Sequence, residues 1–352
     1  MPNIDACRQI LRNVDKTRVS NAGLLLARYL PVAVESADHP KERKKLFEDA
    51  ISACQKAESV YREAFARWKD AVKPDCSKDL YVRDRMIVGL GGQSVLETGI
   101  TLHHTYGVPI IPGSALKGLA SHYCHHVWGQ DNNESGNFNI EFKAFGVDYV
   151  DKEGKKFERQ GQYHRVLFGA NENAPEANDH AGYIIFHDAW IDPESLAIPN
   201  ILSSDVMTPH HSGYYSADDD KTAPTDFDSP IPHPFISIPR GCKFWISVSC
   251  DLKDETARKD WARLALDLLC QALEYWGIGG KTGSGYGCLV DESKVQTIEI
   301  EETRSKPDSA GYKAKRDDRR GENKSVEKED KRSVKKRIKE VKRKMGRKGF
   351  RF

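Results

Sequence analysis

Between residues 41 and 72, apolar side chains recur every three or four positions, which predicts one long amphipathic helix. The helix is expected to end before Pro74, because proline cannot continue it. The same reasoning predicts a shorter helix over residues 18–29, which ends before Pro31, and a further helix over residues 255–276. The apolar stripe of the long helix consists of Leu46, Ala50, Cys54, Ala57, Tyr61, Phe65, Trp68 and Val72.

After Pro74 the pattern changes to short runs rich in aromatic and β-branched residues, separated by glycines, which predicts β-strands. The predicted strands are 86–90, 182–190, 242–250 and 288–290, with a hairpin tip at 151–156 and a helix from Ser114 towards Trp128. Residues 205–234 show little periodicity. Strands that alternate with a few helices, without regular βαβ spacing, predict an α+β fold with an antiparallel sheet.

The chain of 352 residues is long enough for one large or two ordinary domains. It contains no apolar run approaching the roughly 18 residues of a membrane span, and residues 1–10 lack the apolar stretch of a signal peptide. The eight cysteines form no CxxC pair, which argues against structural zinc and favours free thiols. We therefore expect a cytoplasmic protein without a membrane partner.

Charge is distributed unevenly along the chain. Residues 304–352 carry a net charge of +13, whereas residues 1–303 carry −11. A basic tail on an acidic body indicates an anionic partner such as nucleic acid, although a solvated tail explains the charge equally well. We expect three parts: an N-terminal segment with the long helix (1–75), a core (76–303) and a basic, disordered tail (304–352) that could form a helix near 331–345 on binding.

The first segment with candidate chemistry is 110–124, where Pro112 and Gly113 predict a turn and Ser114 a helix N-cap. Lys117 in the first helical turn is unfavourable for an isolated helix, because its charge has the same sign as that end of the helix dipole. A phosphate between the Lys117 ammonium and the first amides would remove the conflict. The alternative is an ordinary capped helix with an exposed lysine.

The second segment is the glycine-rich loop 277–287, whose glycines allow close backbone approach or positive φ. A Walker loop is disfavoured, since Tyr275 stands where it needs glycine and since this loop follows a helix instead of a strand. We predict a cationic loop that touches a sugar–phosphate backbone, with Gly279 and Gly280 for close approach, Lys281 for charge and Tyr286 for stacking. The alternative is a wide turn.

The third segment is 206–234. Four of its side chains suit stacking on unpaired bases, namely His210, His211, Tyr214 and Tyr215. Five carboxylates could instead bind a hard cation, although a solvated turn is the commoner role of such a run. They are Asp218, Asp219, Asp220, Asp226 and Asp228.

Five histidines stand near the first segment: His103, His104, His122, His125 and His126. His122 and His126 have the i,i+4 spacing of a two-histidine metal pair on a helix. No HExxH glutamate accompanies them, and we favour histidines at the surface or at a polar interface. We therefore expect neither a metal nor a cofactor.

Taken together, these segments resemble the RAMP superfamily of CRISPR RNA-guided effector proteins, and within it the sixth-subunit family of the Cmr (type III-B) complex. The resemblance covers roughly residues 15–295. The matching stretches are NAGLLLARYLP (21–31), LETGITLHHTYGVPIIPGSALKGLASHY (96–123), VLFGANE (166–172), GYIIFHDAW (182–190), VMTPHHSGYY (206–215) and GIGGKTGSGYG (277–287).

The resemblance implies a ferredoxin-like (RRM-like) βαββαβ core with insertions. It also implies a non-catalytic subunit that binds CRISPR guide RNA, with target RNA, and caps a backbone of related RAMP subunits near the 3′ end of the guide, in antiviral defence. Carried over by position, Ser114, Lys117 and the Lys281 loop would lie along the guide RNA. The basic tail is not part of the family pattern.

An enzymatic alternative remains open from the residues. The chain could be an endoribonuclease that uses His210 or His211 as general base, or the aspartates of 218–228 with a metal ion. In related backbone subunits a loop aspartate cleaves target RNA with a divalent ion, but no aspartate of this chain matches that loop. We therefore expect no catalytic residue here.

Overall fold

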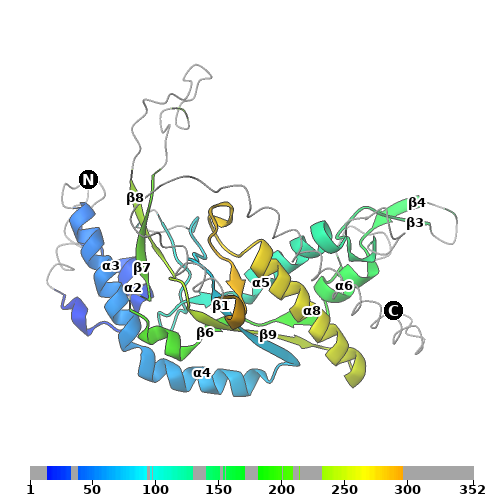
Figure 1. Cartoon of the computed structure of the whole chain (residues 1–352), viewed down its shortest axis with the longest axis horizontal. Helices are drawn as coiled ribbons and strands as arrows, with labels where there is room; N and C mark the ends of the chain where they lie inside the picture. The colour runs from blue at the N-terminus through cyan, green and yellow to red at the C-terminus, as the bar shows by residue number, and fades with distance from the viewer. Residues whose placement is uncertain are drawn as a thin grey trace, which may run out of the picture.

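The computed structural model describes residues 14–32, 39–92, 96, 98–129, 140–150, 154, 156–170, 181–199, 201–208, 214 and 232–295. Within these residues, helices cover both faces of an antiparallel sheet (Figure 1). The predicted α+β class with an antiparallel sheet is confirmed. The predicted tail, 304–352, lies outside the described residues.

The six-stranded sheet has the order β10-β1-β9-β6-β2, and β5 pairs with β9. β9 is its longest strand, because residues 243–250 alternate between two covered faces and nearly all are buried. The prediction at 242–250 is thus confirmed, whereas the run at 182–190 forms two strands separated by His187 and Asp188. The bounds are β1 Cys76–Val82, β2 Ile110–Ile111, β5 Ile184–Phe186, β6 Ala189–Ile191, β9 Lys243–Cys250 and β10 Leu289–Val290.

The strand predicted at 86–90 is wrong, since only Met86 forms an isolated bridge, with Ile238. The β-branched residues of this run are buried in the core, but one of its carbonyls is taken by another segment: Ile87 O accepts from Gly280 N. The β-branched residues had suggested a strand here.

Two helices, α5 (Gly113–Tyr123) and α8 (Glu255–Tyr275), pack against each other on one face of the sheet. α8 begins as predicted, because the side chain of Asp254 accepts from Ala257 N at 2.8 Å and caps the helix. Its apolar stripe faces the sheet, with Trp261, Leu264, Leu268 and Ala272 buried.

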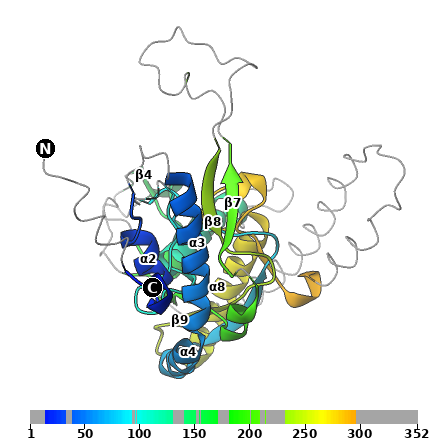
Figure 2. The ribbon, with the colours of Figure 1, turned by 90° about the vertical axis from the view of Figure 1, so that its left-hand side faces the viewer.

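The helical conformation predicted over 41–72 is confirmed, but the prediction of one continuous helix is wrong, because the chain breaks at Ala57 into α3 (His39–Lys56) and α4 (Glu58–Val72). Figures 1 and 2 show α4 turning away from α3. α3 packs on α2 (Ala22–Arg28), whereas α4 crosses the sheet face opposite α5 and α8. There the Tyr61 hydroxyl donates to Ile191 O at 2.6 Å, and Trp68 stacks on Trp190 at 5.1 Å.

Two hairpins form separate two-stranded sheets. β3 (Val147–Val150) pairs with β4 (Lys156–Arg159), which confirms the hairpin predicted around 151–156. β7 (Ser203–Met207) pairs with β8 (His233–Ser237), so the prediction of little regular structure over 205–234 is wrong at both ends of that range. Figure 2 shows the second hairpin beside α3. The remaining elements are η1 (Lys16–Arg18), the π-helical η2 (Cys124–Trp128), η3 (Ile140–Phe142), α6 (Gln162–Phe168), η4 (Pro193–Ala197) and η5 (Thr282–Ser284).

One cluster of buried apolar side chains runs from Ala22 to Leu289 and includes α2, α3, α4 and the sheet. The buried Arg43 joins α3 to the segment that contains Leu96 and Thr98 and to β8. Its Nη2 lies 2.6 Å from both Leu96 O and Pro234 O, and 3.0 Å from the Thr98 hydroxyl. The segment predicted as 1–75 therefore shares its core with the segment predicted as 76–303.

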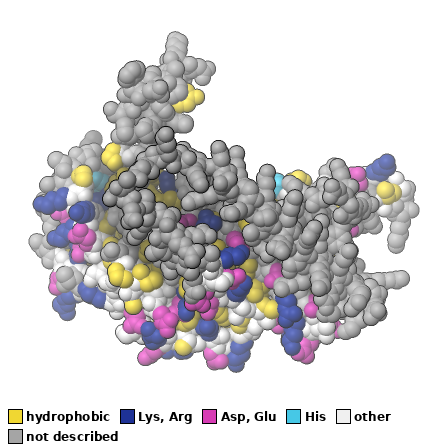
Figure 3. All heavy atoms as spheres, viewed as in Figure 1, with side chains coloured by type: hydrophobic (Ala, Val, Ile, Leu, Met, Phe, Trp, Pro, Cys, Tyr) yellow, Lys and Arg dark blue, Asp and Glu magenta, His cyan; other side chains and the backbone are white. Residues whose placement is uncertain are grey.

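The surface shown in Figure 3 carries acidic and basic side chains intermixed over α4. Two i,i+4 ion pairs of that helix, Arg62–Glu58 and Arg67–Glu63, belong to this mixture. Among the described helices, none is long and apolar enough to cross a membrane. The seven described cysteines are free thiols, as predicted.

Candidate nucleic-acid interface

The glycine-rich loop 277–287 lies against the segment 85–88. Gly280 N donates to Ile87 O at 2.8 Å, and Gly287 N donates to Arg85 O at 2.7 Å. Gly279 has φ +88°, and a Cβ there would lie 2.1 Å from Ile87 O. Only glycine fits this approach. The close approach that these glycines allow is made to this chain's own backbone, and the contact of Gly279 and Gly280 with a sugar–phosphate backbone stays a prediction.

Lys281 lies at the bend of the loop, in the left-handed conformation (φ 59°, ψ 28°) just before η5. Its Nζ lies 5.7 Å from the centre of the Phe235 ring and 6.0 Å from that of Tyr286. These contacts hold the half-buried ammonium between the loop and β8 by cation–π attraction. The structure thus places the predicted cation at the junction of the loop and the β7–β8 hairpin.

Tyr286 connects the same two elements. Its hydroxyl donates to Asp205 Oδ2, which also lies 3.2 Å from Arg85 Nη1. Burial, together with this hydrogen bond to a carboxylate, raises the pKa of Tyr286 to about 12. The ring lies 6.2 Å from Phe235. The predicted stacking residue therefore has its hydroxyl and part of its ring engaged within the protein.

A small cleft of about 250 Å³ opens beside Tyr286. Arg85 and Arg240 line it together with Ser284, Gly285 and Tyr286, while Asp84 stands at the same cleft and pairs with Arg83. Arginine side chains are among the groups that proteins use to bind phosphate oxygens.

The start of α5 differs from the prediction. Pro112 holds the N-cap position, so Ser114 is not the cap, and the helix begins at Gly113. The amide of Gly113 donates to Asp188 Oδ1 at 2.7 Å, so a carboxylate from the segment between β5 and β6 satisfies the first amide of the helix. The phosphate between Lys117 and the amides of the first turn stays a prediction. Ser114 is exposed and Lys117 is half-buried.

Gly113 is needed for packing, because a Cβ would lie 2.2 Å from Phe186 O. This glycine and Gly279 are thus both explained by contacts within the protein. Neither requires a bound strand.

The third predicted segment falls largely outside the described residues: His210, His211, Tyr215 and the aspartates of 218–228 have no described structure. Tyr214 is described, and 48% of its surface is exposed. The stacking role of these residues and the endoribonuclease alternative stay predictions.

The histidines near α5 divide into two groups. His103 packs on Trp190 (4.7 Å) and Tyr106 (4.8 Å) over the sheet, and burial lowers its pKa. His122 and His126 are exposed, which confirms the surface placement. Among the described residues, no group of three or more His, Cys, Asp or Glu side chains could hold a metal ion.

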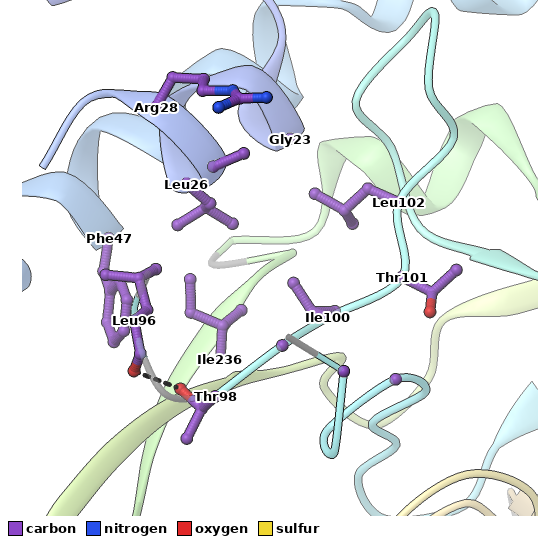
Figure 4. Close-up of a pocket in the computed structure, with 14 residues that line it drawn as sticks. Gly23, Leu26, Arg28, Phe47, Leu96, Thr98, Ile100, Thr101, Leu102 and Ile236 are labelled. Atoms are coloured by element: carbon purple, nitrogen blue, oxygen red, sulfur yellow. Dashed lines mark hydrogen bonds between the residues drawn. The ribbon is translucent and has the colours of Figure 1, made fainter. Parts of the chain in front are cut away.

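A larger groove of about 620 Å³ lies between α2 and the segment 96–102 (Figure 4). Leu26, Ile100 and Leu102 are among the apolar side chains that line it, and Arg28 stands at its rim. Thr98 donates to Leu96 O at its base. The groove is lined by polar and apolar surface in about equal measure, and it does not include the Lys281 loop.

Sequence reasoning missed the residues that hold the loop in place. Arg85, Asp205 and Phe235 come from three separate segments, and only the tertiary fold brings them to Lys281 and Tyr286. A local signal existed for Asp188 alone, since an acidic residue at a break between two strands can accept from a neighbouring helix N-terminus.

Comparison with known proteins gives a consistent family. The family model described as the RAMP superfamily matches residues 79–290. The CRISPR system Cmr subunit Cmr6 of Pyrococcus furiosus is 30% identical over 273 residues, which cover 71% of this chain and 78% of that protein.

Two solved structures are also similar. The crystal structure of Cmr6 from Pyrococcus furiosus has a TM-score of 0.36 at 28% identity, and the match covers 61% of this chain and 96% of that one. A chain in the cryo-EM structure of the type III-B Cmr-beta complex bound to cognate target RNA has a TM-score of 0.45 at 18% identity, with 73% and 76% covered.

Proposed function

This chain belongs to the RAMP superfamily and, within it, to the family of the CRISPR system subunit Cmr6, and from this membership we propose that it is a subunit of a type III-B Cmr effector complex. In that complex it binds guide RNA without cleaving it. It caps the backbone of related RAMP subunits near the 3′ end of the guide, with target RNA paired to the guide, in antiviral defence.

The strand order supports a ferredoxin-like core for this role. In the segment β10-β1-β9-β6, every neighbouring pair is antiparallel. α5 lies between β1 and β6 along the chain, and α8 lies between β9 and β10, which gives the sequence βαββαβ. On this assignment β2, β5 and the two hairpins are additions to the core.

The sheet face opposite α5 and α8 is covered by α4, which favours an RNA contact at another part of the surface. RRM domains stack bases on the sheet face that their two helices leave open. Here α4 occupies that face, with Trp68 stacked on Trp190 and the Phe65 ring edge-on to Trp245 at 6.4 Å. The proposal therefore places the guide RNA at the loop edge of the sheet.

The observation that carries the proposal is the position of Lys281. Its ammonium stands on a glycine-rich bend held by Tyr286, Asp205 and Arg85, beside a cleft that Arg85 and Arg240 line. A positive charge on a fixed bend suits a sugar–phosphate strand of any sequence. Guide RNA in CRISPR effectors is recognised through its shape and backbone.

The test uses the full chain and a fluorescent guide RNA, with Lys281→Ala compared with Lys253→Ala. Lys253 is exposed and precedes α8, a helix of 21 residues that spans about 30 Å. The two variants lose the same charge at opposite ends of α8. We expect weaker binding and a shallower salt dependence, by about 0.7 in log–log slope, for Lys281→Ala alone. Equal effects of both variants, or none for Lys281→Ala, would contradict the proposal.

A further inference from the structure

α5 continues into a π-helical turn, η2, which changes the direction of its last side chains. Gly129 N donates to Cys124 O at 2.8 Å, the i→i+5 bond of this conformation. Cys124 and Trp128 point into the core, where Trp128 Nε1 donates to Gln271. Single π-helical turns occur frequently at functional sites. The buried side chains account for the packing of this turn and leave its histidines facing outward.

The outward side chains form a continuous row of rings, which we call the imidazole row: Phe145, His125, His126, His122 and Trp276. Successive ring centres lie 4.2, 4.6, 4.5 and 5.4 Å apart. Phe145 is 65% exposed, His122 and His126 are exposed, and the other two rings are half-buried. Exposed rings in mutual contact are unusual, because such surface is normally buried or used for binding.

The neighbours that act on the pKa of His125 all act in one direction. Burial lowers the pKa of His125, and the neighbouring His126, Lys143 and His122 lower it further. Its Nδ1 accepts from Ala144 N at 3.1 Å, so the neutral ring carries its proton on Nε2. The row thus combines ring faces with the nearby ammonium of Lys143.

Metal binding fits this geometry poorly. The rings of His122 and His126 meet edge to face, with an interplanar angle of 80°. Chelation needs the lone pairs of both rings to converge in their planes on one point. An edge packed on a ring face serves ring contact instead.

We propose that the imidazole row stacks on unpaired RNA bases and so forms a second RNA contact of this subunit. This inference rests on the proposed function. Histidine, phenylalanine and tryptophan rings are platforms for single-stranded bases, and a nearby cation attracts the connecting phosphates. Trp276 directly precedes Gly277, so the row adjoins the Lys281 loop along the chain. A strand held at the loop by its phosphates would thus have ring faces next to it.

The test separates base stacking from backbone contact. Full-length protein is titrated with two fluorescent oligoribonucleotides of equal length, one with adenine bases and one abasic throughout. Phe145→Ala combined with His126→Ala should weaken binding of the adenine RNA by about fivefold or more, since stacking contributes roughly 1–3 kcal/mol per base. Binding of the abasic RNA should not change. Val60→Ala, at a 62%-exposed position of α4, is the matched control and should change neither.

Further outcomes separate the two proposals. Lys281→Ala should weaken binding of both RNAs, and wild-type protein that binds neither would overturn the proposed function itself. The single variants His126→Ala and His126→Phe are also compared, with Phe145 unchanged. Because His126→Phe keeps a ring, it should bind the adenine RNA more tightly than His126→Ala does. Unchanged adenine RNA affinity in the double variant overturns the stacking proposal, as does an equal loss for both RNAs or binding that requires added zinc.

Discussion

Replacing Tyr286 with phenylalanine tests how the Lys281 loop is held. The change removes only the hydroxyl that donates to Asp205 and keeps the ring beside Phe235. Asp205 retains the Val206 amide at 2.8 Å and Arg85 at 3.2 Å, so no carboxylate is left without partners. The variant therefore measures one hydrogen bond to a charged acceptor.

Such a bond contributes about 1.5–3 kcal/mol when it is well buried. The Asp205 side chain is 23% exposed, so solvent screens the bond, and we expect a loss near 1 kcal/mol in the free energy of unfolding. For a domain of this size the midpoint of thermal unfolding should fall by about 2–4 °C. Calorimetry at neutral pH gives the value directly.

The pH dependence gives an independent reading of the same bond. The pKa of Tyr286 is raised in the folded protein, to about 12, from an unfolded value of about 10. The folded state thus favours the protonated hydroxyl, so its contribution is complete below pH ~10 and is lost as the pH rises through about 12. The stability difference between wild type and Tyr286→Phe should shrink over that interval. If wild type and Tyr286→Phe were equally stable at neutral pH, or if their difference did not change between pH ~10 and about 12, the hydrogen bond between Tyr286 and Asp205 would be refuted.

Three further predictions concern other parts of the chain. Arg43→Met should lower the free energy of unfolding, measured by urea denaturation, by about 3 kcal/mol, because Leu96 O and Pro234 O lose a buried charged donor. A loss below about 1 kcal/mol would contradict a stabilising role of these hydrogen bonds. Deletion of 304–352 should weaken RNA binding at low salt and have little effect at high salt, as a filter-binding titration would show, if the tail is an electrostatic arm. Pure full-length protein should not cleave RNA with Mg²⁺, and cleavage lost in EDTA or in His211→Ala would establish the endoribonuclease alternative instead.

Features encoded locally could be predicted from the sequence. α8 has a capping aspartate directly before a regular apolar stripe, and both signals act within one helix. The break at Ala57 could not be seen, because the apolar stripe stays in phase across it. What turns α4 away from α3 is its contact with Trp190 and Ile191, more than 100 residues later in the chain. The pairing of β7 with β8 was missed because residues 205–234 show little periodicity.

For the candidate site, too, local features could be predicted from the sequence and long-range contacts could not. The glycines of 277–287 indicated that a backbone comes close, but which backbone was decided by the fold, which places Ile87 there. Ser114 had the residue type of an N-cap, yet Asp188 from another element takes the first amide of the helix. Residue type thus predicted a need for a partner, and only the tertiary structure identified the partner.

The position of α4 across the sheet also has a consequence for biosynthesis. Phe65 contacts Trp245, and the two residues are separated by 180 positions along the chain. At a translation rate of about 5–20 residues per second, the ribosome needs roughly 10–35 s to make the second ring after the first. Throughout that interval the apolar side of α4 has no sheet to cover, so the nascent chain presents a binding surface for chaperones that disappears once β9 has emerged.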